Sequence, residues 1–552
     1  MKIVLVALNS SYTHTNSAVR IFANLLSERH DVSIFETTVN EKGGVLALCE
    51  RLYKMHADLY AFSVYIWNKE LQLALAKNIK KLLPNCKIVV GGPEVSFCEK
   101  DFLVENDYID YLIKGEGEKA ICDIADEKYE PKCIVDGGVY EDFSTSDEPY
   151  FCAKHPTSCP DGSLLYYETS RGCPYNCSYC LSSVKREGER VRAKKVELVK
   201  KELSVLLSKN IRTLKFVDRT FNFDKERAVE IFSFIIDFEK NFGKCPTCHF
   251  EICASLLDEK TIDLLSKAPA GLFRFEIGVQ TATPETLLEI GRRDDTEKII
   301  ANVKKLKEKT FVTVHLDLIC GLPFDTYEKI GYAFDRIYGI SDHLQVGVLK
   351  LLHGTKMRRN AQKYGMRFLE DPPYTLLFSD TFSFEQMRKL EKIADMVETF
   401  SEEGCGFYQS CDFLVSKSSS PFALFEKLSE FFPDDENISH REKYLRLCRF
   451  GCELLSDHDK CILKEKLRYD FLVSNQGKVP SEFDRIYTAE EKRFLEEIRT
   501  SIIHEAPKGE SGFFVPALET HLFAFDDPKI YLIDRKNKLV QTRDRSCFVQ
   551  VV

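Results

Sequence analysis

Short apolar runs alternate with helical periodicity along the first part of the chain. The runs occupy residues 2–8, 32–36, 58–65, 88–94 and 108–114. Apolar runs of this length are typical of strands that are buried on both faces, and the segments between them repeat apolar residues at the spacing of an amphipathic helix. Strands that alternate with helices on short connections predict a doubly wound parallel sheet, here a Rossmann-like α/β domain over residues 1–145.

The same alternation resumes in the middle of the chain. Strands are predicted at residues 164–169, 213–216, 249–254, 274–281, 312–319 and 343–351. Amphipathic helices fill the intervals between them. Successive β–α units of this kind predict a partial (β/α)6 barrel over residues 146–360, and the functional face of such a barrel is the carboxyl end of its strands.

The last part of the chain is mainly helical in its periodicity. Helices are predicted at residues 384–400, 421–432, 442–455 and 488–504, and a hairpin is predicted at 529–542 with its turn at 535–538. These segments predict a mostly α-helical domain over residues 361–552. Two interpretations of this domain stay open: a packing domain with an ordinary helical core, and a lid that closes the barrel mouth over a substrate.

Charge and composition narrow the class of protein. The 552 residues include 77 basic and 86 acidic ones, for a formal charge of −9, and this balance predicts no contact with nucleic acid or an anionic membrane surface. No apolar run is long enough to predict a membrane span. Residues 9–16 follow the apolar start without a small-residue cleavage pattern, so we expect residues 2–8 to form a strand and not a secretory signal, and we expect a cytoplasmic location.

The 20 cysteines are scattered along the chain, which argues against a disulfide framework. Three of them, Cys173, Cys177 and Cys180, stand in one tight loop. Four thiolates normally complete a tetrahedral zinc or iron–sulfur site. Three therefore predict a metal centre with one coordination position left for another ligand. The alternatives are a structural zinc loop and three unrelated core cysteines.

Polar, aromatic and glycine-rich segments follow the predicted strands of the first domain. Parallel sheets bind ligands beyond the carboxyl ends of their strands, and glycines there let the backbone approach a large flat ligand. No Gly-x-Gly-x-x-Gly follows the first strand, which disfavours a dinucleotide. The candidate cofactor-binding residues at this edge are Ser10, Ser11, Tyr12, Thr13, His14, Ser63, Tyr65, Trp67, Asn68, Gly91, Gly92, Pro93, Glu94, Gly115, Glu116, Gly117 and Glu118.

The cysteine loop resembles that of the radical S-adenosylmethionine (SAM) enzymes, whose signature is Cys-x-x-x-Cys-x-x-Cys. In that family the three thiolates hold a [4Fe–4S] cluster, SAM chelates the fourth iron, and a six-unit barrel carries the loop after its first strand. The resemblance implies metal-binding and catalytic roles for the three cysteines, and SAM contacts at the later strand ends. The implied SAM contacts are Tyr179, Asp218, Arg219, Gln280, Thr281 and Gly321.

Charged residues inside the predicted barrel strands form a second set of candidates. A carboxylate in a barrel interior is costly unless it is paired. Glu251 and Glu276 are therefore candidates for contacts with ribose, an amino group or the substrate. His249, His315 and Asp317 also fall inside strands. For these three, a satisfied interior polar group and a catalytic role fit the pattern equally well.

The first domain resembles the cobalamin-binding domain that precedes the radical SAM domain in one large subfamily. Gly-Gly-Pro at residues 91–93 and Gly-Glu-Gly-Glu at residues 115–118 carry this resemblance, which implies cobalamin as a further cofactor. The Asp-x-His-x-x-Gly loop that supplies a lower histidine ligand in other cobalamin methyltransferases is absent. His14 does not match its spacing, so we expect a lower cobalt face without histidine. The alternative is a sheet that has lost its ligand.

Together, the two resemblances imply an enzyme that uses a [4Fe–4S] cluster, SAM and cobalamin to methylate an unactivated carbon or phosphorus. The substrate, a small molecule or a peptide, is not identified by the sequence. A flavodoxin- or ferredoxin-type protein is the expected electron donor. Two alternatives are a cobalamin-dependent rearrangement or cyclisation without methyl transfer, and a non-catalytic cobalamin or redox sensor. Intact cysteines and polar strand ends disfavour the sensor.

Overall fold

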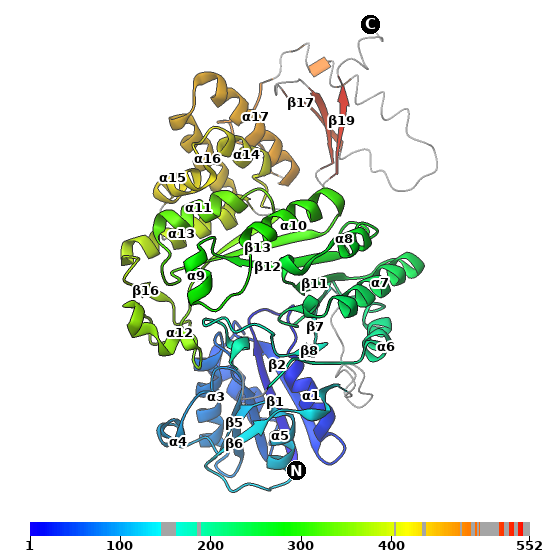
Figure 1. Ribbon diagram of the computed structural model, residues 1–552, viewed down its shortest axis with the longest axis vertical. Coiled ribbons are helices and arrows are strands. Elements are labelled where there is room, and N and C mark those ends of the chain that lie inside the picture. Colours follow the sequence, from blue (N-terminus) through cyan, green and yellow to red (C-terminus); the bar gives the residue numbers. More distant parts are fainter. Residues whose placement is uncertain are drawn as a thin grey trace. The chain divides into compact units, whose positions relative to one another are not determined.

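The computed structural model describes residues 1–144, 162–184, 189–401, 405–432, 438–474, 477–486, 489, 492–493, 496, 518–523, 529–534 and 539–544. The chain forms two compact units (Figure 1). The first comprises Met1–Thr326 and Val348–Phe384, and the second comprises Tyr327–Gly347 and Glu385–Val552. The domain boundaries expected near residues 145 and 360 stay a prediction.

The first unit begins with a parallel sheet in the order β2-β1-β3-β4-β5-β6. Its strands are β1 Lys2–Asn9, β2 Asp31–Thr38, β3 Leu59–Ser63, β4 Lys87–Gly91, β5 Tyr111–Gly115 and β6 Cys133–Gly138. Its helices are α1 Ser17–Leu26, α2 Gly44–Tyr53, α3 Lys69–Leu82, α4 Lys100–Glu105 and α5 Gly117–Ala125. The doubly wound sheet expected from the sequence is confirmed, and β6 is an addition that the apolar pattern missed.

Helices bury both faces of this sheet, and β1 contributes to both cores because its successive residues point to opposite sides. Val4, Val6 and Leu8 belong to one core, which also contains Leu52 and Leu75 from α2 and α3. The intervening residues of β1 belong to a second core with residues of α1 and α5; they are Ile3, Leu5 and Ala7. The continuous apolar run in the sequence thus reflects a strand that is covered by helices on both faces.

A second parallel sheet follows in the same unit, with its strands in the order β13-β12-β11-β10-β7. These strands are β7 Leu164–Tyr167, β10 Thr213–Phe216, β11 Thr247–Glu251, β12 Phe273–Gln280 and β13 Thr313–Cys320. Their helices are α6 Val196–Leu206, α7 Lys225–Phe242, α8 Glu259–Leu265, α9 Pro284–Glu289 and α10 Thr296–Lys309. The sixth predicted strand is present as β14, His343–Val348.

Alternation along these strands separates two faces. In β12, Phe273 and Phe275 are fully buried, whereas Arg274 and Glu276 are only partly buried. The phenylalanine rings pack against Phe232 of α7 at 5.5 and 5.6 Å between centroids. The helix-covered face of the sheet is therefore aromatic, and the opposite face is polar.

The second unit is mainly helical. Its helices include α11 Tyr327–Ile337, α13 Phe384–Ser401, α14 Tyr408–Ser416, α15 Pro421–Phe431, α16 His440–Leu454 and α17 Asp457–Ser474. The first residue of α13, Phe384, is assigned to the first unit. The rings of Tyr444 and Phe407 pack at 4.2 Å between centroids in its core. Three helices predicted between residues 384 and 455 are present, and the helix expected at 488–504 lies largely outside the described residues.

Three antiparallel strands follow: β17 Leu518–Phe523, β18 Lys529–Asp534 and β19 Leu539–Asp544. The pairing of β18 with β19 confirms the strands of the predicted hairpin, whereas its turn at 535–538 lies outside the described residues. No helix within the described ranges combines the length and the apolar character needed to cross a membrane.

Candidate active site

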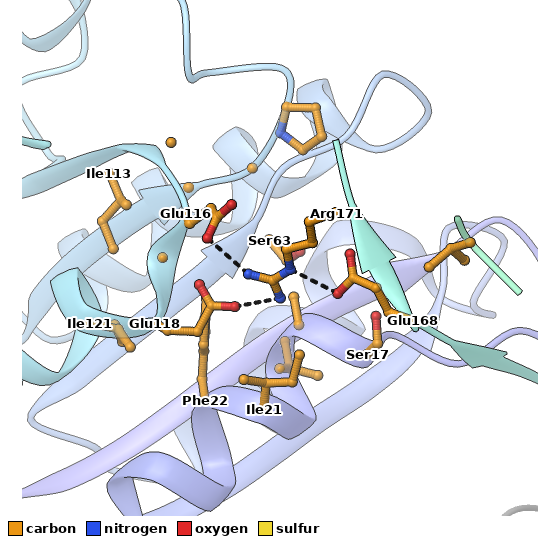
Figure 2. A pocket seen from close by; sticks show the side chains of 18 of the residues that line it. Ser17, Ile21, Phe22, Ser63, Ile113, Glu116, Glu118, Ile121, Glu168 and Arg171 are labelled. Atoms are coloured by element: carbon orange, nitrogen blue, oxygen red, sulfur yellow. Dashed lines mark hydrogen bonds and ion pairs between the residues drawn. The ribbon is translucent and has the colours of Figure 1, made fainter. Parts of the chain in front are cut away.

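A cavity of about 460 Å³ opens at the carboxyl ends of β3, β4 and β5 (Figure 2). Its floor is the sheet face that carries Leu5, Ala61, Val89 and Ile113, and its walls include Ala18 and Phe22 of α1 and Ile121 of α5. These side chains make the deep part of the cavity apolar. The cavity extends from the carboxyl ends of the strands along one face of the first sheet, between α1 and α5.

The mouth of the cavity is glycine-rich and charged. The glycines that line it include Gly91, Gly92, Gly115 and Gly117, and the charged residues are Glu116, Glu118, Glu168, Arg171, Glu189, Arg190 and Arg219. Gly92 has a φ of +115°, and a Cβ there would lie 2.5 Å from the backbone oxygen of Val64. Only glycine therefore fits at this position of the turn after β4.

Ten of the residues predicted at this edge and at the barrel strand ends line the cavity. They are Ser63, Tyr65, Gly91, Gly92, Pro93, Gly115, Glu116, Gly117, Glu118 and Arg219. The ring of Trp67 stacks on Tyr65 at 4.5 Å between centroids. Asn68 is buried and donates to the backbone oxygens of Leu8 and Ser63, so its visible role is to fix the turn after β3.

The loop after β1 lies beside the second sheet instead of lining the cavity. The backbone oxygen of Thr13 accepts from the amide of Leu164, and His14 Nδ1 lies 2.7 Å from the hydroxyl of Tyr166. Ser10, Ser11 and Tyr12 are likewise outside the cavity lining. Among the described residues that line the cavity there is no histidine.

Glu94, at the end of the Gly-Gly-Pro-Glu motif, is held in a buried polar cluster. Lys69 Nζ lies 3.1 Å from its carboxylate and 2.9 Å from the hydroxyl of Tyr374, and that hydroxyl donates to Glu94. Both Glu94 and Tyr374 are buried. This cluster joins the first sheet to the segment that follows the barrel.

Replacing Tyr374 with phenylalanine is expected to lower the free energy of unfolding by about 1–2 kcal/mol, because the buried Glu94 carboxylate loses a donor. The midpoint of urea unfolding, monitored by circular dichroism, measures this change. Tyr408→Phe is the matched control, since Tyr408 is 65% exposed. Equal midpoints for both variants would contradict the expectation.

The three cysteines stand together in the loop after β7. Cys177 is buried, Cys173 and Cys180 are partly buried, and all three are free thiols. Cys173 Sγ lies 3.6 Å from the hydroxyl of Thr220. Burial raises the pKa of Cys177, and the nearby Arg292 opposes this shift. In the described part of the chain, no group of three or more His, Cys, Asp or Glu side chains is arranged so that it could hold a single metal ion.

Arg292 is a feature of this region that the sequence did not single out. Its side chain is 16% exposed, and its guanidinium donates to the backbone oxygen of Gly278 at 2.5 Å and to Asp294 at 3.0 Å. Burial opposes the charged form, yet the neighbouring groups Tyr179, Asp294 and Cys177 hold the pKa of Arg292 above its ordinary value. It is thus a fixed cation beside the cysteine loop.

Asp218 supports the start of the cysteine loop. It is fully buried and accepts from the amide of Thr169 at 2.9 Å and from the hydroxyls of Thr169 and Ser170 at 2.5 Å each. Arg219, the next residue, turns toward the cavity. Farther along the strand ends, Thr281 donates to Asp325 at 3.0 Å, and Gln280 and Gly321 have positive φ angles of 71° and 94°.

Charged side chains line the polar face of the second sheet. Glu276 lies 3.0 Å from His249 and 3.2 Å from Lys215, and these contacts lower its pKa to about 2 although burial opposes ionisation. Glu251 lies 3.6 Å from Arg219. Burial, with Glu276 and Glu251 nearby, raises the pKa of Asp317 to about 7. His249 is therefore a partner of Glu276, whereas one buried carboxylate oxygen of Asp317 has no hydrogen-bond partner among the residues that the structure describes.

Family models match three successive parts of the chain. The B12 binding domain matches residues 3–125, the radical SAM superfamily matches residues 167–337, and a protein of unknown function (DUF4080) matches residues 362–508. The chain is therefore a cobalamin-dependent radical SAM enzyme. The radical SAM domain implies a [4Fe–4S] cluster and SAM, and the B12 binding domain implies cobalamin, which confirms the predicted cofactors.

Two curated relatives align over much of the chain. An uncharacterized methyltransferase, PH0819 of Pyrococcus horikoshii, is 26% identical over 56% of this chain and 70% of its own length. The cobalamin-dependent radical SAM methyltransferase TokK of Streptomyces tokunonensis is 24% identical over 70% of this chain and 60% of its own length. The chain thus spans less than two thirds of TokK.

Solved structures share the fold at low identity. The cobalamin-dependent radical enzyme OxsB, with aqua-cobalamin and SAM bound, superposes with a TM-score of 0.55 at 13% identity, over 87% of this chain and 84% of OxsB. The methyltransferase TsrM from Kitasatospora setae gives a TM-score of 0.53 at 15% identity, over 90% of this chain and 99% of TsrM.

The residues present fit the implied groups. Three free thiols on one loop suit a [4Fe–4S] cluster, because each thiolate binds a different iron and no single-ion geometry is needed. Cobalamin combines a broad corrin edged with amides and an aromatic base on a tail. A glycine-rich polar mouth above an apolar channel offers matching surfaces for such a ligand.

Proposed function

We propose that this enzyme transfers the methyl group of SAM to an unactivated carbon or phosphorus of its substrate. The observation that carries the proposal is the adjacency of two sites within one compact unit. Ser170, Arg171 and Gly172 line the cavity at the edge of the first sheet, and the next residue is Cys173. Relatives named as methyltransferases support methyl transfer as the class of reaction.

When bound, a reduced [4Fe–4S] cluster supplies the electron that cleaves SAM to methionine and a 5′-deoxyadenosyl radical, and cobalamin supplies a carrier for a methyl group. Cys173, Cys177 and Cys180 would hold the cluster through three of its irons. We assign Arg292 to the carboxylate of SAM, because it is a largely buried cation beside Cys177.

Two carboxylates of the barrel interior are assigned to the amino group and ribose of SAM or to the substrate. The ion pair of Glu251 with Arg219 is long, at 3.6 Å. One buried oxygen of Asp317 lacks a partner in the described structure. A pKa of about 7 lets Asp317 hold or release a proton near neutral pH. Because the cluster needs electrons of low potential, we infer a flavodoxin- or ferredoxin-type donor and a cytoplasmic location.

The test begins with anaerobic reconstitution with iron and sulfide, with and without hydroxocobalamin, followed by SAM and a strong reductant. Mass spectrometry then quantifies S-adenosylhomocysteine and 5′-deoxyadenosine. Methyl transfer predicts S-adenosylhomocysteine only when cobalamin is present. Deoxyadenosine alone under all conditions would favour a rearrangement, and SAM cleavage no higher than in a Cys177→Ala variant would favour a sensor.

Filling the cavity should remove cobalamin without disturbing the cluster. In Ala18→Phe, the added ring occupies the channel between α1 and the sheet, so we expect cobalamin affinity to fall by at least about 100-fold, or roughly 3 kcal/mol. Equilibrium dialysis with hydroxocobalamin measures this loss, and the iron content after reconstitution without cobalamin should equal that of the wild type. Lys77→Phe, at an exposed position of α3, is the control. Equal affinities of the two variants would contradict the assignment of the cavity.

A further inference from the structure

A short two-stranded ribbon precedes the cysteine loop and places two positive charges opposite each other. Strand β8, Ser170–Arg171, pairs antiparallel with β9, Arg192–Ala193, and Arg171 stands directly opposite Arg192. Like charges at opposed positions of an antiparallel pair destabilise it. The ribbon therefore needs a carboxylate that neither strand supplies.

Glu116, from the Gly-Glu-Gly-Glu segment of the first domain, supplies that carboxylate. One of its oxygens lies 3.1 Å from Arg171 and 3.2 Å from Arg192, and the other accepts from Arg192. The same carboxylate accepts from the amide of Tyr140 at 2.7 Å. Burial opposes ionisation of Glu116, but the hydrogen bond from Arg192 and the charge of Arg171 hold its pKa below the usual range.

Arg171 uses its whole guanidinium fork in this network (Figure 2). Beyond Glu116, it lies 2.7 Å from Glu118 and 3.0 Å from Glu168. Its side chain is 13% exposed and lies over the ring of Phe143 at 4.5 Å. Three nitrogens that each meet a different carboxylate, in a site partly closed to water, fix the relative position of the segments they join.

The two segments joined by Arg171 belong to the two candidate cofactor sites. Glu116 and Glu118 line the mouth of the cavity, and Gly172, with a φ of +91°, turns the chain directly from Arg171 into Cys173. We infer that Arg171 is a positioning residue that ties the Gly115–Glu118 loop to the cysteine loop, so that cluster loading and cobalamin binding strengthen each other. This inference rests on the proposed function of the two sites.

The test measures cobalamin affinity in protein with and without its cluster. Trp67 is the single tryptophan and stacks on Tyr65, which lines the cavity, so quenching of its fluorescence reports hydroxocobalamin binding. In the wild-type protein, cluster loading is expected to tighten binding by about 5-fold or more, and by linkage cobalamin should favour cluster loading equally.

Arg171→Gln is expected to weaken cobalamin binding about 10-fold and to bring the ratio of the two affinities, with and without cluster, to within about 2-fold of unity. Arg171→Lys should recover part of the ratio, because an ammonium keeps the charge and loses the planar fork. Glu118→Gln weakens the contact with Arg171 from the side of the first domain, keeps the contacts of Glu116 with Arg171 and Arg192, and should reduce the ratio. Arg29→Gln, which breaks an exposed ion pair with Asp126, is the control and should behave as wild type.

Distinct results would overturn the inference. A wild-type ratio retained in both Arg171→Gln and Glu118→Gln would do so, as would a lower melting temperature with unchanged cobalamin affinity, which indicates a structural role only. If the wild-type protein binds no cobalamin at all, the proposed function fails first. Failure of the proposed function is thus distinguishable from failure of the inference, because it is seen in the wild-type protein before any variant is compared.

Discussion

Replacing Cys177 with alanine is expected to abolish SAM cleavage. Three thiolates from one loop are the only protein ligands assigned to the cluster, and two thiolates hold it poorly. Cys177 is also the most buried of the three, so water cannot readily take its place. We expect loss of the broad iron–sulfur absorption, iron content near background and no 5′-deoxyadenosine above that of protein-free controls.

The matched control for this variant is Cys49→Ala. Cys49 is an equally buried free thiol in α2, in the core of the first domain. It should keep its iron and its SAM cleavage within about 2-fold of wild type, because Cys49 lies outside both the cavity lining and the cysteine loop. Equal SAM cleavage in Cys177→Ala and Cys49→Ala would refute the assignment of the cluster.

Arg292→Gln is expected to reduce SAM cleavage at subsaturating SAM by roughly 100-fold while the cluster is retained. A largely buried cation that meets a substrate carboxylate contributes several kcal/mol, and its loss leaves that carboxylate unpaired. The effect should appear mainly as a higher KM for SAM, since the residue is assigned to binding of the amino-acid end. Iron content and the visible spectrum should match those of the wild type.

The neighbouring Arg293 provides a control with the same chemistry in a different environment. Arg293 is exposed, so Arg293→Gln should leave SAM cleavage within about 2-fold of wild type. Arg292→Lys keeps the charge and loses the planar guanidinium, whose Nη2 donates to both Gly278 and Asp294, and an intermediate KM is expected. A KM for Arg292→Gln equal to that of Arg293→Gln would remove Arg292 from the SAM site.

Some site residues have roles that local sequence could not reveal. Asn68 and Glu94 follow strands at the functional edge, as ligand-binding residues do. In the structure, however, both side chains bind other groups of the protein. The partner of Glu94 that decides this, Tyr374, is 280 residues away. Arg292 stands in an Arg-Arg-Asp-Asp run, which looks like a solvated charged surface until the fold buries one member of it.

The amino-acid sequence alone predicts the alternation of strands and helices, the three-cysteine loop and the glycine segments at the sheet edge. Each of these depends on periodicity or on residues close together in the chain. Which side chains meet around the two candidate cofactor sites depends instead on the tertiary fold. Arg171 and Glu116 lie 55 residues apart, and the like charges of Arg171 and Arg192 face each other only after the ribbon forms. Contacts between segments far apart in the chain arise from packing, and no local pattern encodes them.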